Sequence, residues 1–241
     1  MIKRTLLKTI LFIVVGLFFS ADAYGQSKAI ISLATQYSQT LRKFENQKPR
    51  GGVELLHSKG RVIGEKLDEL EALSENEYAL VVKKMKGFVV NRSETVFVNP
   101  DVNFYKNLSK KYGTKADVAF FNLLGELKPD SVWSAYVEQQ TDYSGCTIYG
   151  GGKLTALYGK AKQFKKQLPA AYASDVNEAI NDIKETFTND TCACGDRRSV
   201  IKEFQSFINA FPKDAITPAI RKCLAEVEQK QTSFRFQCHS V

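Results

Sequence analysis

The side chains best suited to bind a ligand or catalyse a reaction are concentrated in one short segment near the middle of the chain. Between Tyr136 and Cys146 the sequence YVEQQTDYSGC combines acids, amides, hydroxyls and a thiol, and the glycine run Gly150–Gly152 follows. Glycines let a backbone approach a ligand closely, and polar loops with aromatic residues are frequent binding sites. We therefore expect a ligand or partner site, if the protein has one, at Tyr136, Glu138, Gln140, Asp142 and Tyr143.

Two carboxylates in this segment raise the question of catalysis. Glu138 and Asp142 stand four residues apart, so on a helix they would share one face. Such a pair could act as general acid and base in the hydrolysis of a glycan. A ligand site without catalysis and a solvated loop anchored by a disulfide at Cys146 fit the same residues. The cell-envelope hydrolase is therefore an alternative to a non-catalytic role.

The motifs of common enzyme classes are missing from the sequence. His57 and His239 are its only histidines, and neither lies in a recognisable motif. There is no G-x-S-x-G or H-E-x-x-H, and the glycine run lacks the Lys-Ser/Thr of a phosphate loop. We expect His57 to be an ordinary helix residue. These absences favour a protein that is not an enzyme and uses no cofactor.

The cysteines indicate disulfides rather than a metal site. Cys146, Cys192, Cys194, Cys223 and Cys238 follow the N-terminal region, and in an exported protein such residues are first interpreted as disulfide partners. Their spacing, with His239, matches no common zinc signature, so we expect no metal.

The spacing also suggests how the cysteines pair. Cys192 and Cys194 flank a single residue and rarely satisfy disulfide geometry with each other. If the last two helices form a hairpin that turns near Asp214, one of the two bonds to Cys238 and the other reaches Cys146. Cys223 lies on an apolar helix stripe, and we expect it to be a buried thiol outside the disulfides.

The first 23 residues have the three parts of a secretory signal peptide. The basic start MIKRTLLK precedes the apolar run Ile10–Phe19, and Ala21 and Ala23 supply the small residues of a cleavage site. The apolar run is shorter than the roughly 20 residues that span a bilayer. We expect a periplasmic or secreted protein whose mature chain has no transmembrane segment.

The chain is basic, which bears on its partners. Its formal net charge of +8 falls to +6 when the signal peptide, with three positive charges and one negative, is removed. This excess favours adhesion to anionic envelope polymers. No zinc-finger or RNP-like signature accompanies the lysines, so we expect no nucleic acid. The partner is expected to be an unidentified envelope protein or an anionic polymer.

Hydrophobic periodicity predicts a mainly α fold of helical hairpins in one array or bundle. Apolar residues recur at helical spacing in both halves of the chain, and Ser74, Thr114, Ser174 and Thr217 are expected N-caps. The exceptions are a β-like stretch near residues 87–98 and an irregular loop near residues 138–152. We favour a linker over a hairpin at 87–98, because isolated hairpins are marginal.

Two segments share a pattern of apolar residues. The spacing Tyr105-x2-Leu108-x3-Tyr112-Gly113 is echoed by Phe204-x2-Phe207-x3-Phe211-Pro212, and a second helix is expected after each. The pattern resembles the helical hairpins of tetratricopeptide-like repeats. With the stretch Phe88–Val98 and the segment around Cys146, the chain is similar to uncharacterised secreted bacterial proteins. This resemblance implies export and implies no activity.

These observations give a domain division and a first hypothesis for function. We expect an N-terminal helical region over residues 24–128 and a C-terminal helical region with disulfides over 129–241, or one continuous domain over 24–241. The favoured role is an exported, non-catalytic binding or scaffold protein of the bacterial envelope.

The signal peptide gives the first testable prediction. Because Ala21 and Ala23 match the small-residue positions of the cleavage site, we expect the mature chain to begin at Tyr24. N-terminal sequencing of the exported protein measures this directly. A product that still begins at Met1 would contradict it.

Overall fold

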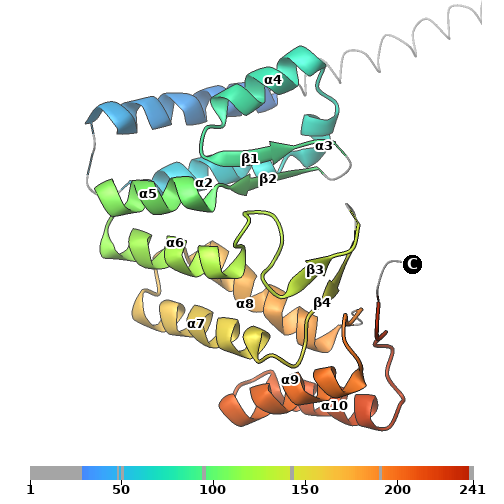
Figure 1. The fold of residues 1–241 in the computed structure, drawn as a ribbon. Coiled ribbons are helices and arrows are strands. Elements are labelled where there is room, and N and C mark those ends of the chain that lie inside the picture. Colours follow the sequence, from blue (N-terminus) through green and yellow to red (C-terminus); the bar gives the residue numbers. More distant parts are fainter. Residues whose placement is uncertain are drawn as a thin grey trace, which may run out of the picture. The chain divides into compact units, whose positions relative to one another are not determined.

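The computed structural model describes residues 29–47, 49, 52–93, 96–141, 144–189 and 192–238. The expected signal peptide, Asp142, Tyr143 and His239 lie outside these residues. As predicted, the fold is mainly helical, with two small two-stranded sheets (Figure 1). The chain divides into an N-terminal unit, Met1–Asp101, and a C-terminal unit, Val102–Val241. The sequence predicts either a boundary at residue 128 or one continuous domain over residues 24–241.

The N-terminal unit packs helices around a short hairpin. Residues 29–47 are helical, and α2 (Val53–Gly64), α3 (Leu67–Glu71) and α4 (Glu75–Lys84) follow. Helix α4 begins at the predicted capping box, in which the Ser74 side chain accepts from the Glu77 N–H and the Glu77 carboxylate accepts from the Ser74 N–H. The core of this unit is a set of apolar side chains that includes Ile30, Tyr37, Leu56, Ile63, Leu70, Val81 and Met85.

The stretch near residues 87–98 is a β-hairpin, so our preference for a linker was wrong. Strand β1 (Phe88–Asn91) pairs antiparallel with β2 (Phe97–Pro100), and Phe88 lies opposite Pro100. The hairpin is stable because it is not isolated. The Phe88 ring packs edge-on against Tyr37 at 5.4 Å between centroids. It also occupies the space beside Gly60, where a Cβ would come within 2.1 Å of the ring.

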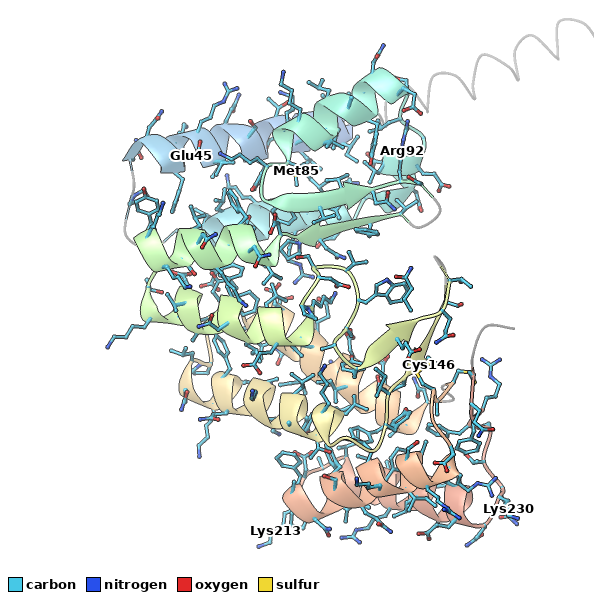
Figure 2. The ribbon with its side chains drawn as sticks, in the orientation of Figure 1. Glu45, Met85, Arg92, Cys146, Lys213 and Lys230 are labelled. Carbon is cyan, nitrogen blue, oxygen red and sulfur yellow. A yellow bond between two sulfur atoms is a disulfide. The ribbon has the colours of Figure 1, made fainter. Side chains whose placement is uncertain are left out.

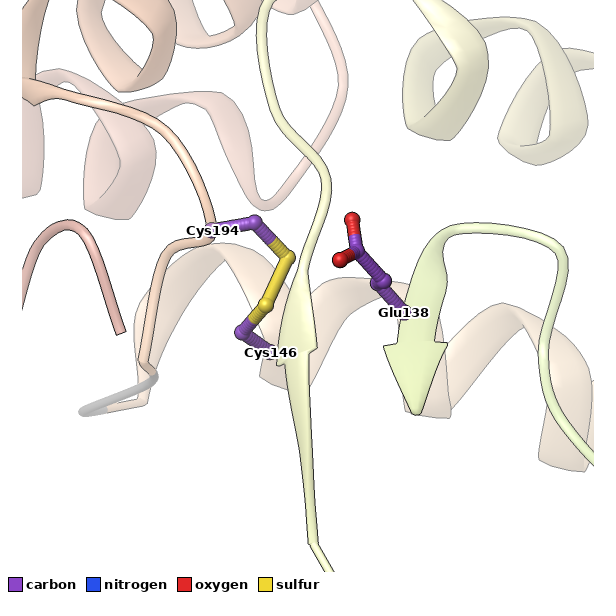
Figure 3. Close-up of side chains that lie close together, drawn as sticks. All are labelled: Glu138, Cys146 and Cys194. Atoms are coloured by element: carbon purple, nitrogen blue, oxygen red, sulfur yellow. A yellow bond between two sulfur atoms is a disulfide. The ribbon is translucent and has the colours of Figure 1, made fainter. Parts of the chain in front are cut away.

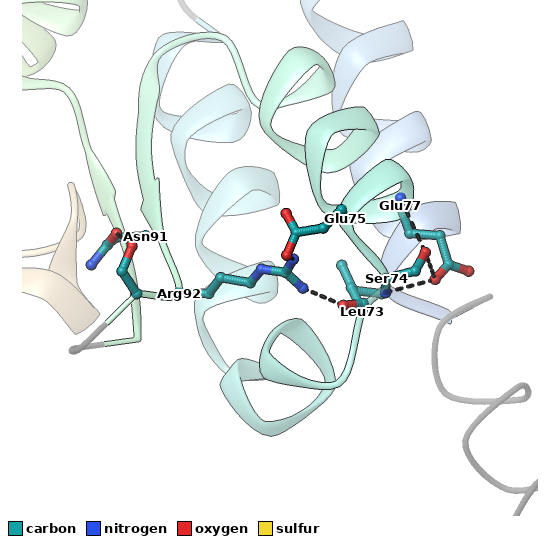
Figure 4. A network of polar contacts seen from close by, with 7 residues as sticks. Leu73, Ser74, Glu75, Glu77, Asn91 and Arg92 are labelled. Atoms are coloured by element: carbon teal, nitrogen blue, oxygen red, sulfur yellow. Dashed lines mark hydrogen bonds and ion pairs between the residues drawn. The ribbon is translucent and has the colours of Figure 1, made fainter.

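A polar network joins the end of this hairpin to the start of α4. The Arg92 guanidinium donates to the Leu73 carbonyl, forms an ion pair with Glu75 and lies 4.4 Å from the centre of the Tyr78 ring. Figure 4 shows it beside the Ser74–Glu77 capping box. Because Arg92 is engaged on three sides, we assign it a structural role.

His57 is an interior residue of α2. Its side chain is fully buried and stacks against Phe88 with 6.3 Å between ring centroids. Burial, aided by the nearby positive charge of Arg61, lowers the pKa of His57 from 6.5 to about 3. The imidazole is therefore neutral in the folded protein at neutral pH and has no access to a substrate.

The C-terminal unit contains three consecutive helical hairpins. They are α5 (Val102–Tyr112) with α6 (Lys115–Leu127), α7 (Lys153–Gln167) with α8 (Ala173–Thr188), and α9 (Arg197–Ala210) with α10 (Thr217–Glu228). The two helices of each hairpin pack on each other, and α7 also packs on α6 and α9. Strands β3 (Val137–Gln139) and β4 (Gly145–Thr147) lie between the first two hairpins in the sequence. None of the described helices combines the length and apolarity needed to cross a bilayer.

The predicted helix starts in this unit are partly correct. The capping box of Thr114 and Asp117 is present at α6. Ser174 is not an N-cap, because α8 begins one residue earlier, after Tyr172 in the left-handed region at φ 49°. Thr217 is also not an N-cap. It is the first residue of α10, and its hydroxyl donates to the Phe211 carbonyl.

The middle hairpin is bonded to the turns of both neighbouring hairpins through tyrosine hydroxyls. Tyr172 donates to Asp117 Oδ1 at 2.6 Å, and its ring stacks on Phe120 at 3.7 Å. Tyr158 donates to Asp214 Oδ1 at 3.0 Å. Burial alone raises the pKa of Asp214, but the Ile216 N–H, Lys162 and Tyr158 together lower it below its ordinary value. Asp117 and Asp214 therefore each link the middle hairpin to one of its neighbours by a hydrogen bond.

The burial of His57 predicts how stability depends on pH. Its folded pKa is depressed, so its contribution to stability is complete above pH 6.5 and falls as the unfolded chain binds a proton that the folded protein excludes. We expect the free energy of unfolding of the N-terminal unit to drop by about 2 kcal/mol between pH 7 and pH 5. Urea unfolding followed by hydrogen-exchange mass spectrometry measures it.

The matched variant is His57→Gln, which carries no charge over this range. We expect the drop attributed to His57 to disappear in the variant. An equal pH dependence in both proteins would contradict the assignment.

Candidate functional site

The polar segment in the middle of the chain forms a short β-hairpin. Strand β3 pairs antiparallel with β4, with Glu138 opposite Cys146 and Gln139 opposite Gly145. Glu138 lies on a strand, so the helical arrangement considered for the Glu138 and Asp142 pair does not apply to it. Asp142 and Tyr143 are outside the described residues, so the separation of the two carboxylates is not part of the described structure.

Two further extended segments, around residues 192–194 and around Arg235, extend this hairpin by hydrogen bonds on the side of β4. The Thr147 N–H donates to the Cys192 carbonyl at 2.7 Å, and the Cys194 N–H donates to the Thr147 carbonyl at 2.9 Å. On the other side, the Ala193 N–H donates to the Arg235 carbonyl at 2.8 Å. Residues 192–194 therefore lie between β4 and the C-terminal segment.

Both disulfides start from this central segment. Cys146 is bonded to Cys194, and Cys192 is bonded to Cys238, with 5.0 Å and 5.8 Å between their respective Cα atoms. Because residues 192–194 lie between β4 and the C-terminal segment, Cys194 has a partner on one side and Cys192 on the other. This is one of the two pairings that the sequence left open. Cys223 lies on α10 outside both bonds, and it is half-buried instead of buried as expected.

Two polar side chains lie beside one disulfide: Glu138 on β3 and Gln140, which directly follows that strand. Gln140 Nε2 donates to Glu138 Oε1 and to Cys146 Sγ, each at 3.2 Å. Figure 3 shows the Glu138 carboxylate beside the Cys146–Cys194 bond, with its oxygen and both sulfurs within 4.8 Å of one another. A disulfide offers no thiolate, so these three residues are not a set of metal ligands in the oxidised chain.

The expected site residues differ in exposure. Glu138 is exposed and Gln140 is half-buried, whereas Tyr136 is in the core with 5% of its surface exposed. Burial raises the pKa of Tyr136. Tyr136 therefore supports the hairpin from below and does not contribute a contact surface. The exposed rim consists of Glu138, Gln139, Thr141 and Ser144, with Gln140 between them.

The glycine run approaches an internal carboxylate and not an external ligand. Gly150 and Gly152 have φ of 89° and 72°, in the left-handed region that glycine tolerates. Their N–H groups donate to Glu203 Oε2 at 3.0 and 2.7 Å, and the Thr155 N–H and hydroxyl donate to Oε1 at 3.1 and 2.9 Å. Glu203 is completely buried on α9. Its carboxylate caps the beginning of α7, where the helix dipole favours negative charge.

The spacing of apolar residues on α9 is a signal for Glu203 in the sequence. Val200, Glu203 and Phe207 stand at positions i, i+3 and i+7 of one helix, so the acid belongs to the apolar face. A carboxylate on such a face needs buried donors. The nearest glycine run in the chain could have been matched to it.

Comparisons with known proteins add no information about the site. No family model, no curated protein and no solved structure matches this chain.

The carboxylate of Glu203 gives a test of this architecture. In Glu203→Gln one acceptor oxygen is replaced by an NH2 group that faces N–H donors. We expect the free energy of unfolding to fall by about 2–4 kcal/mol, measured by urea denaturation with the disulfides intact. Glu185→Gln, an exposed site on α8, is the control and should change stability by less than about 0.5 kcal/mol. Equal effects in the two variants would contradict the role of Glu203.

Proposed function

We propose that the protein is an exported, non-catalytic binding or scaffold protein of the bacterial envelope. Its partner contacts the exposed rim of the β3–β4 hairpin. The observation that carries the proposal is the combination of a polar, exposed rim with a base that two disulfides and a buried carboxylate hold in place. When the backbone beneath a binding surface is already rigid, less conformational entropy is lost on binding.

We propose the cellular location of the protein from two features together. The sequence begins with the three parts of a signal peptide. Four cysteines of the C-terminal unit are in disulfides, which persist in oxidising compartments such as the periplasm. We therefore place the mature chain in the periplasm or outside the cell.

The rim side chains supply the test of binding. We expect the double substitution Glu138→Ala and Gln140→Ala to reduce recovery of the partner at least about tenfold, because two adjacent polar contacts are lost. The measurement is quantitative mass spectrometry of proteins and glycans captured from the native envelope fraction. The fold is checked by circular dichroism and by non-reducing peptide mapping.

The control is the double substitution Gln163→Ala and Glu185→Ala, at exposed helix positions of the same unit. It removes the same side-chain types and should leave capture unchanged. If both double variants capture as well as the native chain, the rim is only structural. If fractionation finds the chain in the cytosol with reduced cysteines, the export proposal fails.

A further inference from the structure

The turns of the three C-terminal hairpins carry a cluster of lysines. We call them the turn lysines: Lys110, Lys111, Lys115, Lys165, Lys166 and Lys213. All six side chains belong to exposed residues, and none forms an ion pair with another described residue of the chain. Two pairs occupy the last turns of α5 and α7, Lys115 begins α6, and Lys213 lies between α9 and α10.

The structure brings these turns to one end of the C-terminal unit. Tyr172, just before α8, bonds to Asp117 at the start of α6, so the first two turns are neighbours. Lys162 on α7 forms an ion pair with Asp214 at 3.1 Å, which places the third turn against the same helix. Figure 1 shows the three turns stacked at one end of the helices, and Figure 2 labels Lys213 there.

The acids of this end do not neutralise the turn lysines. Asp117 is buried and accepts from Thr114 and Tyr172. Asp214 accepts from Tyr158 and is paired with Lys162, which is not a turn lysine. Asp175, in the first turn of α8, is half-buried. Glu178, in the second turn of the same helix, is exposed. The six turn lysines therefore outnumber the acids of this end that are not already bonded to a tyrosine or another lysine in the described structure.

A role in helix capping accounts for only part of the cluster. Lysines in the last turn of a helix interact favourably with its dipole, which explains Lys110, Lys111, Lys165 and Lys166. Lys115 is at a helix N-terminus, where a positive charge is unfavourable, and Lys213 is outside a helix. Lys115 and Lys213 therefore add positive charge to this end that helix capping does not explain.

We propose that the turn lysines form a binding surface for a linear polymer with repeated anionic groups, such as an acidic polysaccharide of the cell envelope. Packed helices lie about 8–10 Å apart, so three stacked turns present ammonium groups along roughly 20 Å. That spacing matches several successive charged units of an extended polymer. This surface is separate from the β3–β4 rim and goes beyond the proposed function, resting only on the export that the proposed function assumes.

A bilayer surface is the less favoured occupant. Membrane-surface segments combine basic residues with large apolar side chains that enter the lipid. Within the described chain, the large apolar residues that are clearly exposed are Leu55, Val62, Leu80, Val82 and Ile148. None of them lies in the three turns.

The test compares two neutralising variants of the full mature chain. The first is Lys111→Gln, Lys166→Gln and Lys213→Gln, which removes one ammonium group from each turn. The control is Lys153→Gln, Arg198→Gln and Lys202→Gln, exposed positions in the first halves of α7 and α9, away from their turn ends. The probe is dextran sulfate, with neutral dextran as the uncharged reference, and binding is measured by calorimetry at several salt concentrations.

We expect the turn variant to bind dextran sulfate at least about tenfold more weakly than the native chain. The slope of log K against log salt should be reduced by about two. The control variant should bind nearly as the native chain does. Equal losses in both variants, or no binding by the native chain, would overturn the proposal.

Two further measurements assign the source of the anion. Stronger binding to phosphatidylglycerol vesicles or to single-stranded DNA than to dextran sulfate, with the same loss in the turn variant, would overturn the polysaccharide in favour of that ligand. The species whose capture depends on Glu138 and Gln140, identified by their loss in the rim variant, are measured separately and should be captured equally by the turn variant. Failure of this surface is therefore distinguishable from failure of the proposed function.

Discussion

The buried carboxylate of Glu203 needs hydrogen-bond donors inside the C-terminal unit. The conformation of the chain at the start of α7 follows from that requirement. An ionised group in the interior is tolerated only when donors surround it. Gly150, Gly152 and Thr155 supply four hydrogen bonds from the start of α7. The backbone must turn through the left-handed region to bring these donors together, which is why glycines stand there. The hydrogen bonds to Glu203 thus set the orientation of the first turn of α7 relative to the preceding strand β4.

The position of β4 in turn decides what the disulfides join. Cys146 lies on β4, and residues 192–194 pair with it because they precede α9, the helix that carries Glu203. The C-x-C arrangement then lets one extended segment bond to β4 and to the C-terminal segment at once. The disulfides close loops of 48 and 46 residues in sequence separation, and loops of that length restrict the unfolded chain by about 4 kcal/mol each in the entropic model.

A second set of interactions organises the opposite end of the hairpins. Asp117 and Asp214 each cap or close a turn while accepting a tyrosine hydroxyl from the middle hairpin. These carboxylates are engaged inward, and the turn lysines around them are exposed and form no ion pair with another described residue. The unit therefore has two chemically different ends: a polar rim over a disulfide, and a cationic surface over the turns.

Much of the local structure is already determined by the sequence. The helical stripes and the capping boxes of Ser74 and Thr114 depend on residues within one or two turns of each other, so they were predicted correctly. The C-x-C spacing, together with the predicted hairpin of the last two helices, limited the disulfides to two pairings. Ser174 and Thr217 show the limit of such rules, because the actual helix starts shifted by one or two residues to suit Tyr172 and Phe211.

Contacts between residues far apart in the chain decided the rest. The β1–β2 hairpin exists because Phe88 packs on Gly60 and Tyr37, and no local propensity encodes that support. Glu138 is on a strand because β3 pairs with β4, and β4 is held to residues 192–194 by the Cys146–Cys194 disulfide. The glycine run could be recognised in the sequence as a place of close approach. That it approaches Glu203, more than fifty residues away in the chain, was decided only by the tertiary packing of α7 on α9, since burial of a charge depends on what surrounds it in space.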